Sequence, residues 1–74
     1  MKVVNERKAI ALKKITDASK ELGWMSKNFE RPYPGIRIAE VRLKALCEMA
    51  RIMGIDSRDI YEADRAGFDD GFID

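Results

Sequence analysis

The sequence predicts an all-α protein, a compact bundle of four or five short helices that contains a helix-turn-helix. Apolar residues recur at spacings of three, four and seven over two long stretches, which is typical of helices with one buried face. Glycine and proline separate these stretches. The one alternating segment, residues 36–38, is too short to indicate a strand. At 74 residues the chain has room for a single domain.

Composition narrows the class of protein. Hydrophobic residues make up 46% and charged residues 36%, a mixture typical of a globular, soluble chain. No apolar run approaches the roughly 20 residues that a membrane span needs, and we expect no signal segment and no membrane association. The single cysteine, Cys47, allows no internal disulfide and predicts a reducing cytoplasm. Histidine is absent, so the commonest general base and zinc ligand are missing, and we expect no enzyme, cofactor or metal site.

Charge is distributed unevenly along the chain. Residues 1–55 hold 12 Lys and Arg against 6 Asp and Glu, whereas residues 56–74 hold 2 against 7. This split suggests a face that binds a polyanion beside an acidic end. The alternative is that the charges only solvate a small surface.

The first helical pattern runs from Asn5 to Leu22, either as one long helix or as two helices that meet near Ile15 and Thr16. Gly23 is suited to a left-handed stop after it. A second, short helix is predicted over residues 26–31, with Ser26 as its N-cap. Proline disfavours helical geometry in the residue before it, so this helix ends at Pro32 and residues 31–35 form an ordered loop.

The clearest pattern covers residues 38–53. We expect one apolar face there, made of Ile38, Val41, Ala45, Leu46, Met49, Ala50 and Met53. Gly54 closes this helix. Asp56 and Ser57 suit the N-cap of a last short helix, which carries Ile60 and Tyr61 towards the core. Residues 66–74 are predicted to be an acidic, partly ordered tail.

The stretch from Ile15 to Pro34 has the residue types of a helix-turn-helix. Ser19 is small enough for two helices to cross, and Gly23, four residues later, suits the turn. Leu22, Trp24 and Phe29 would pack the second helix onto the first. The exposed side of that second helix would then be free to enter a major groove.

Two blocks resemble the phage Cro and repressor family of helix-turn-helix proteins. Residues 16–24 (TDASKELGW) are close to the family's scaffold helix and turn, and residues 43–61 are similar to the helix, glycine turn and capped helix that close the repressor-type fold. The resemblance implies a DNA-binding domain over residues 1–65 and a homodimeric, sequence-specific regulator of transcription that binds double-stranded DNA and covers an operator. One departure from the family is that Pro32 and Pro34 shorten the recognition helix.

The resemblance also implies which side chains face DNA. Lys27 is suited to guanine acceptors, Asn28 to adenine, Glu30 to a cytosine amine and Arg31 to a base or a phosphate. Contacts to the DNA backbone are expected from Thr16, Lys20, Ser26 and Arg37. The alternative is a capped surface helix with ordinary solvated charges.

The apolar residues of the tail suggest a second kind of contact. Phe68, Phe72 and Ile73 stand among acidic residues, and we expect them to contact a second copy or a protein partner. The other function class that the sequence allows is therefore a protein-binding inhibitor, antirepressor or antitoxin-like module. The shortened recognition helix, the net charge of +1 and the acidic aromatic tail favour it.

Overall fold

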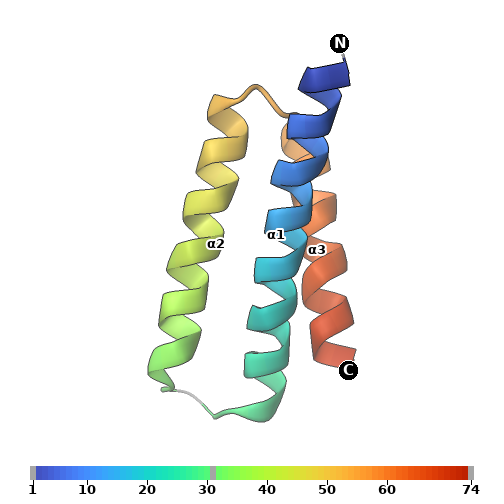
Figure 1. Cartoon of the computed structure of the whole chain (residues 1–74). Helices are drawn as coiled ribbons and strands as arrows, with labels where there is room; N and C mark the ends of the chain where they lie inside the picture. Colours follow the sequence, from blue (N-terminus) through green and yellow to red (C-terminus); the bar gives the residue numbers. More distant parts are fainter. Residues whose placement is uncertain (1, 31, 74) are drawn as a thin grey trace.

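A computed structural model describes residues 2–30 and 32–73, with side-chain environments from residue 6 onward. Three helices make up this part of the chain: α1 (Lys2–Asn28), α2 (Pro34–Ile52) and α3 (Ser57–Ile73) (Figure 1). The prediction of an all-α fold is confirmed, and no strand occurs in the described ranges. The predicted number of helices, four or five, is wrong.

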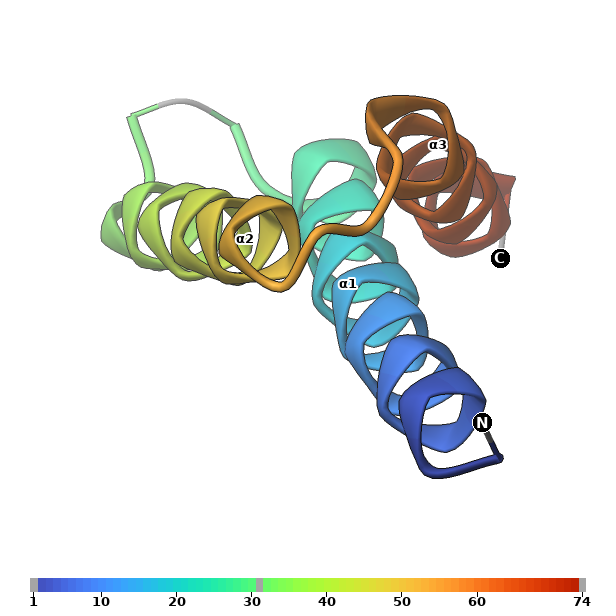
Figure 2. The same cartoon turned by 90° about the horizontal axis from the view of Figure 1, so that it is seen from above.

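Helix α1 lies in the middle of the molecule, with α2 on one side and α3 on the other (Figures 1 and 2). It runs antiparallel to α2 and parallel to α3. Helices α2 and α3 make few contacts with each other, so α1 supplies most of the packing surface for both. The molecule is elongated, with extents of 44 × 21 × 17 Å.

Helix α1 is continuous through the predicted turn. Of the two alternatives for residues 5–22, one long helix is confirmed, but the stop at Gly23 and the separate helix over residues 26–31 are wrong. The reason lies in packing against α3. A Cβ atom on Gly23 would overlap the carbonyl oxygen of Phe68, so the glycine allows a close approach of two helices and not a turn. The helix-turn-helix expected around it does not form.

The loop between α1 and α2 lies earlier in the chain than predicted, between Asn28 and Pro34. Ser26 lies in the last turn of α1, which ends at Asn28, and is therefore no N-cap. Helix α2 begins at Pro34, one turn before the predicted start at Ile38. Proline is favoured at the first position of a helix because its fixed φ is already helical and its missing N–H has no partner there.

The turn between α2 and α3 agrees with the sequence. Gly54 has a φ of 87°, the left-handed geometry expected of a closing glycine. The carboxylate of Asp56 accepts a hydrogen bond of 3.0 Å from the backbone N–H of Arg58, as an N-cap does. Ile60 reaches the core as predicted, whereas Tyr61 is exposed.

Helix α3 is longer than expected. It continues to Ile73, so the prediction of a partly ordered tail is wrong for residues 66–73, and Asp74 lies outside the described residues. Gly67 and Gly71 are buried against α1, and Phe68 packs on the core. Close backbone contact across these glycines explains why a polar, glycine-containing segment is helical.

At the α1–α3 interface, the backbone atoms of the two helices lie in close contact. Cβ atoms on Gly67 and Gly71 would overlap the carbonyl oxygens of Thr16 and Lys20. The hydroxyl of Thr16 lies 3.0 Å from the carbonyl oxygen of Ala63, and that of the fully buried Ser19 lies 2.7 Å from the carbonyl oxygen of Asp64. Along this stretch of the interface, the two helices therefore contact each other through small side chains and hydroxyl donors, and not through bulky apolar side chains.

Charge complementarity also joins α1 to α3. Lys8 pairs with Asp59 at 2.8 Å and Lys20 with Asp70 at 3.1 Å. The basic first part of the chain and the acidic last part thus lie side by side, and these two ion pairs neutralise part of the charge split in the sequence. Solvent screens such exposed pairs, so each contributes little to stability.

Candidate protein-interaction surface

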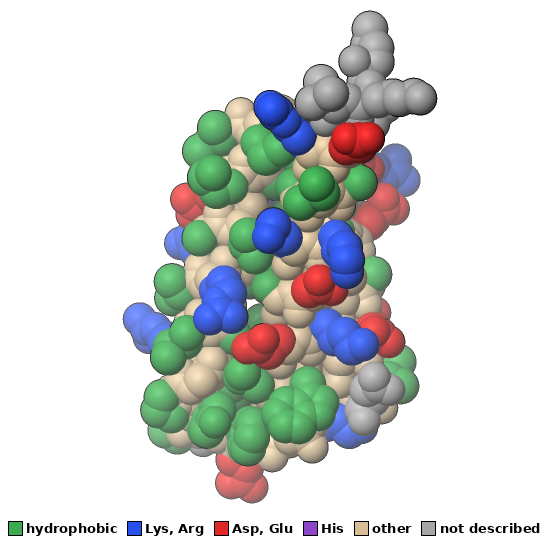
Figure 3. All heavy atoms as spheres, in the orientation of Figure 1, with side chains coloured by type: hydrophobic (Ala, Val, Ile, Leu, Met, Phe, Trp, Pro, Cys, Tyr) green, Lys and Arg blue, Asp and Glu red, His purple; other side chains and the backbone are tan. Residues whose placement is uncertain are grey.

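The outward side of α2 carries a row of exposed apolar side chains. Ile38 and Val41 are each 60% exposed, Met49 is 57% exposed and Ile52 80%. Ala45 lies between them and is also exposed. We name these five residues the outer stripe. In Figure 3 hydrophobic side chains line the edge of the molecule over α2.

Helix geometry explains why this row faces away from the core. With successive residues rotated by about 100°, the outer stripe falls within about 40° on either side of Ala45. The buried residues of α2 lie on the opposite side: Ile36, Ala39, Leu43, Cys47 and Ala50. Helix α2 is therefore apolar on two opposite faces, and α1 covers only one of them.

The predicted core face of α2 is largely wrong. Of its seven residues, Ala50 is buried and Leu46 is half-buried, but the other five are exposed. Both faces repeat at helical spacing, so periodicity alone does not select the buried one. The signal that was available is the presence of a second apolar row at Ile36, Ala39, Leu43 and Cys47.

A shallow apolar groove extends the outer stripe towards α1. It has a volume of about 280 Å³ and is lined mainly by Ile10, Ala11, Leu46, Met49 and Met53. Ile10 and Met53 are themselves about half exposed. The apolar surface is thus continuous from α2 onto the first half of α1, and contiguous surfaces of this kind mark interaction sites more often than scattered apolar residues do.

Aromatic rings gather at the opposite end of the α1–α2 pair. Trp24 meets Phe29 edge to face at a centroid distance of 5.5 Å, and Phe29 stacks on Tyr33 at 4.3 Å. Trp24 and Phe29 do not pack a recognition helix as predicted. They are partly exposed and hold the loop at the end of α1. The ring of Tyr33 thus stacks within the loop and stays partly exposed.

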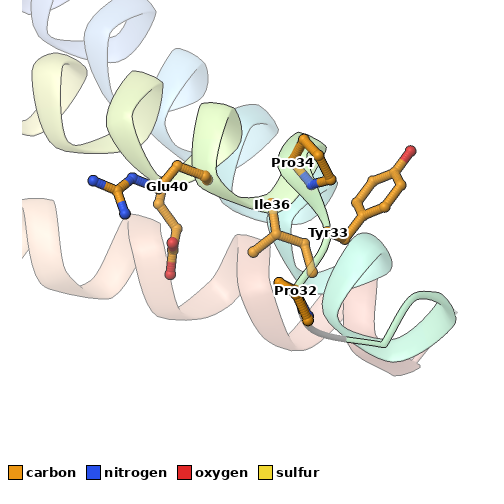
Figure 4. A pocket seen from close by; sticks show the side chains of 6 residues that line it. Pro32, Tyr33, Pro34, Ile36 and Glu40 are labelled. Atoms are coloured by element: carbon orange, nitrogen blue, oxygen red, sulfur yellow. The ribbon is translucent and has the colours of Figure 1, made fainter.

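A pocket of about 500 Å³ lies at the start of α2. In Figure 4 the side chains of Pro32 and Ile36 lie on one side of the loop, whereas the ring of Tyr33 points away. Arg37 and Glu40 supply the charged groups of the lining. An apolar wall with charges at one end is suited to binding a side chain of a partner. A catalytic site would need a nucleophile or an acid beside a base.

The residues predicted to read DNA bases are engaged within the chain or lie in the loop. Lys27 donates a hydrogen bond of 3.0 Å to the carbonyl oxygen of Ile73, at the C-terminal end of α3. The amide of Asn28 donates to the carbonyl oxygen of Trp24 at 2.8 Å. Glu30 is exposed in the loop, and Arg31 lies outside the described residues. Lys27 lies at the C-terminal end of α3 and Asn28 at that of α1, and the partial negative charge of a helix C-terminus does not favour phosphate.

The residues predicted to contact the DNA backbone are spread over the molecule. Thr16 and Lys20 face α3, through the hydrogen bond and ion pair described above. Ser26 is half-buried in the last turn of α1, and Arg37 is exposed near the start of α2. The structure does not bring these four together on one exposed surface.

The three apolar residues of the predicted tail contact have different environments. Phe68 is half-buried against the core, while Phe72 and Ile73 are exposed. The rings of Phe68 and Phe72 stack at a centroid distance of 5.9 Å. Phe72 and Ile73 thus form a small apolar end of α3, separate from the outer stripe.

Cys47 is a core residue. It is buried on the inner face of α2, and burial is the main reason why the pKa of its thiol is raised above the usual range. A raised pKa leaves little nucleophilic thiolate near neutral pH. Within the described ranges, His, Cys, Asp and Glu form no group of three suited to a metal ion. None of the three helices, as far as they are described, has the length and apolar composition to cross a bilayer.

Comparisons with known protein families, curated proteins and solved structures find no match to this chain.

Proposed function

We propose that this chain is a protein-binding module that acts through helix-to-helix contact at the outer stripe of α2. The outer stripe carries the proposal: five apolar residues in a row on one helix face, exposed on the side opposite the core. Single exposed apolar residues are normal on any protein, but a contiguous row on a small monomer is a typical interaction surface.

The form of the surface favours a helical partner. Anchors at spacings of three and four residues are how an amphipathic helix is recognised in a groove or along another helix. The groove beside Met49 and Met53 adds flexible side chains, which adapt their shape to a partner. Of the two function classes that the sequence allows, this supports the inhibitor, antirepressor or antitoxin-like module.

DNA binding of the Cro and repressor type stays a prediction. Its main support in the sequence was the turn at Gly23, and that residue lies inside α1. A DNA-binding protein loses affinity steeply with salt, by about 10³-fold or more between 50 and 200 mM for six or more phosphate contacts. Fluorescence anisotropy with a random duplex at these two salt concentrations measures that loss directly.

Photo-crosslinking in cells that express this chain tests the proposed function. A benzophenone amino acid at Val41 is expected to form covalent adducts with protein, because this position lies in the middle of the outer stripe. The same group at Tyr61, which is 62% exposed on α3, is the matched control. Mass spectrometry identifies the adducts.

A second variant shows whether the adducts depend on the outer stripe. Ile38→Ser together with Ile52→Ser removes two apolar anchors and leaves the core unchanged, so the adducts from Val41 should disappear. If Val41 gives no protein adduct beyond the Tyr61 control, or if the adducts persist in the serine variant, the proposed function is wrong.

A further inference from the structure

We infer that the partner on the outer stripe is a second copy of this chain, with the two α2 helices antiparallel about a two-fold axis at Ala45. This inference rests on the proposed function, because it names the protein that the outer stripe binds. It does not involve Phe68, Phe72 and Ile73, the residues at which the sequence suggested a dimer contact.

The spacing of the outer stripe is the same in both directions from Ala45. Val41 and Met49 lie four residues to either side, and Ile38 and Ile52 lie seven residues to either side. Antiparallel pairing about Ala45 therefore places Ile38 opposite Ile52 of the second copy, and Val41 opposite Met49 of the second copy. A two-fold interface requires such a self-complementary patch, because the same surface serves both subunits.

The sizes of the side chains also suit a two-fold axis at Ala45. Ala45 is the smallest residue of the outer stripe, and it stands where the two helices approach most closely. Larger residues fill the space towards both ends. A small residue at the crossing point, with branched or long apolar residues beside it, is how two helices pack with their side chains interlocked.

The charged residues beside the outer stripe complement one another in this arrangement. Lys44 and Glu48 lie on the same flank of α2. The two-fold axis brings this flank against itself, so Glu48 of one copy stands about two residues, or roughly 3 Å along the helix axis, from Lys44 of the other. The two Lys44 residues have the same offset from each other, and the two Lys44–Glu48 pairs compensate this one like-charged pair. On the other flank, the guanidinium of Arg42 lies 4.0 Å from Glu21 of α1, and its aliphatic part stands beside Met49 of the second copy.

The rest of the molecule leaves room for a second copy. Helix α2 forms an outer edge, and α1 and α3 both lie on its inner side (Figure 2). The free side runs the full 19 residues of α2, about 28 Å at 1.5 Å per residue. A net charge of +1 per chain gives little long-range repulsion between copies.

Charge substitutions at Ala45 test the axis. Ala45 is exposed, and Glu and Lys both favour helix, so Ala45→Glu and Ala45→Lys should fold as the parent does. Sedimentation and light scattering should give the parent twice the chain mass of 8.5 kDa. Each variant alone places like charges on the axis, and its dimer should be weakened by about 100-fold or more. A 1:1 mixture should recover the dimer as a mixed pair.

The recovery on mixing is specific to pairing about residue 45. If the parent is monomeric, if either variant dimerises like the parent, or if the mixture stays monomeric while each variant is folded by circular dichroism, the inference is wrong.

A matched pair of substitutions separates the outer stripe from the end of α3. Ile52 and Ile73 are the last residues of their helices and are 80% and 77% exposed. Ile52→Ser should weaken the dimer by at least about 10-fold, because the residue is buried twice, and Ile73→Ser should leave it unchanged. The reverse result places the dimer contact at α3 and overturns the inference.

The two proposals fail in different ways. A chain that stays monomeric but crosslinks from Val41 to another protein overturns the second-copy inference and supports the proposed function. A chain that neither dimerises nor crosslinks overturns both.

Discussion

Three glycines determine how closely α1 and α3 approach each other. Gly23 faces α3, while Gly67 and Gly71 face α1, and a Cβ atom on any of them would overlap a backbone carbonyl of the opposite helix. Backbone atoms cannot move aside as the end of a side chain does. The two helices therefore keep this distance only as long as all three positions lack a side chain.

Substituting Gly71 by alanine tests this contact. In an isolated helix the change would stabilise by about 1 kcal/mol. Here we expect a loss of about 1–3 kcal/mol in the free energy of unfolding, because α3 must move away from Lys20. Chemical denaturation measures the difference. Glu62→Ala, at an exposed position of the same helix, should stay within about 0.5 kcal/mol. A stabilised Gly71→Ala variant would disprove the close approach.

Single residues also show where sequence reasoning succeeds. The closing glycine at residue 54 and the cap at Asp56 are correct because both depend on local backbone geometry. Gly23 was misread because a glycine suits a turn and a close helix contact equally well. Which of the two applies depends on α3, more than forty residues away in the chain.

At the scale of helices, the sequence predicts that a helix is present more accurately than it predicts where the helix begins and ends. The predicted helices at residues 5–22 and 38–53 both exist, but α1 and α2 each extend further than predicted. The end of α3 was missed because its glycines and acidic residues are typical of a tail. In the fold these residues contact the small side chains and lysines of α1, and such tertiary contacts cannot be inferred from the composition of the segment itself.

The two faces of α2 show the same dependence on context. The outer stripe repeats at least as regularly as the core face, and periodicity therefore predicts most of it as core. Four of its five residues, all except Ile52, were therefore predicted as one set, but with the wrong role. The candidate site follows only from knowing which face α1 covers.

Deleting residues 66–74 distinguishes a tail from a structural helix. Removal of Gly67, Phe68 and Gly71 uncovers α1 over more than a turn, so we expect a lower melting temperature and a loss of helix beyond the deleted residues. Thermal melting followed by circular dichroism measures both. Ile73→Ser, which changes one exposed side chain, should melt like the parent. An unchanged melting temperature after the deletion would contradict the role of α3.

At the scale of the whole molecule, the charge split has an internal explanation. Basic residues of α1 and acidic residues of α3 face each other along two parallel helices. A similar split in other chains suggests binding of a polyanion, but here part of the positive charge is neutralised within the fold. Net charge per segment therefore predicts a partner only when the segments do not pack together.

Stability is expected to fall at alkaline pH. The hydrogen bond and charge of Asp59 raise the pKa of Lys8, and burial raises the pKa of Cys47. A raised folded-state pKa contributes stability that is complete below the unfolded pKa and is lost as pH rises through the folded pKa. The loss should begin above about pH 8.5 for Cys47 and above about pH 10.4 for Lys8.

Denaturation curves between pH 7 and pH 11 measure this loss. Cys47→Ala should remove the part that begins at lower pH, and Asp59→Asn the part that begins at higher pH. Stability that is constant or increases over this range would contradict both assignments.

The parallel pairing of α1 with α3 also determines how the chain acquires its structure. The antiparallel neighbour α2 is available to α1 early, but the tighter partner is the last helix to be synthesised, and contacts such as Thr16 with Ala63 close a loop of 47 residues. Contacts between distant residues slow folding relative to bundles whose neighbours are joined by short loops. Until α3 docks, the carbonyl groups and small side chains of α1 remain in water, so the α1–α2 hairpin alone is an incomplete folding unit.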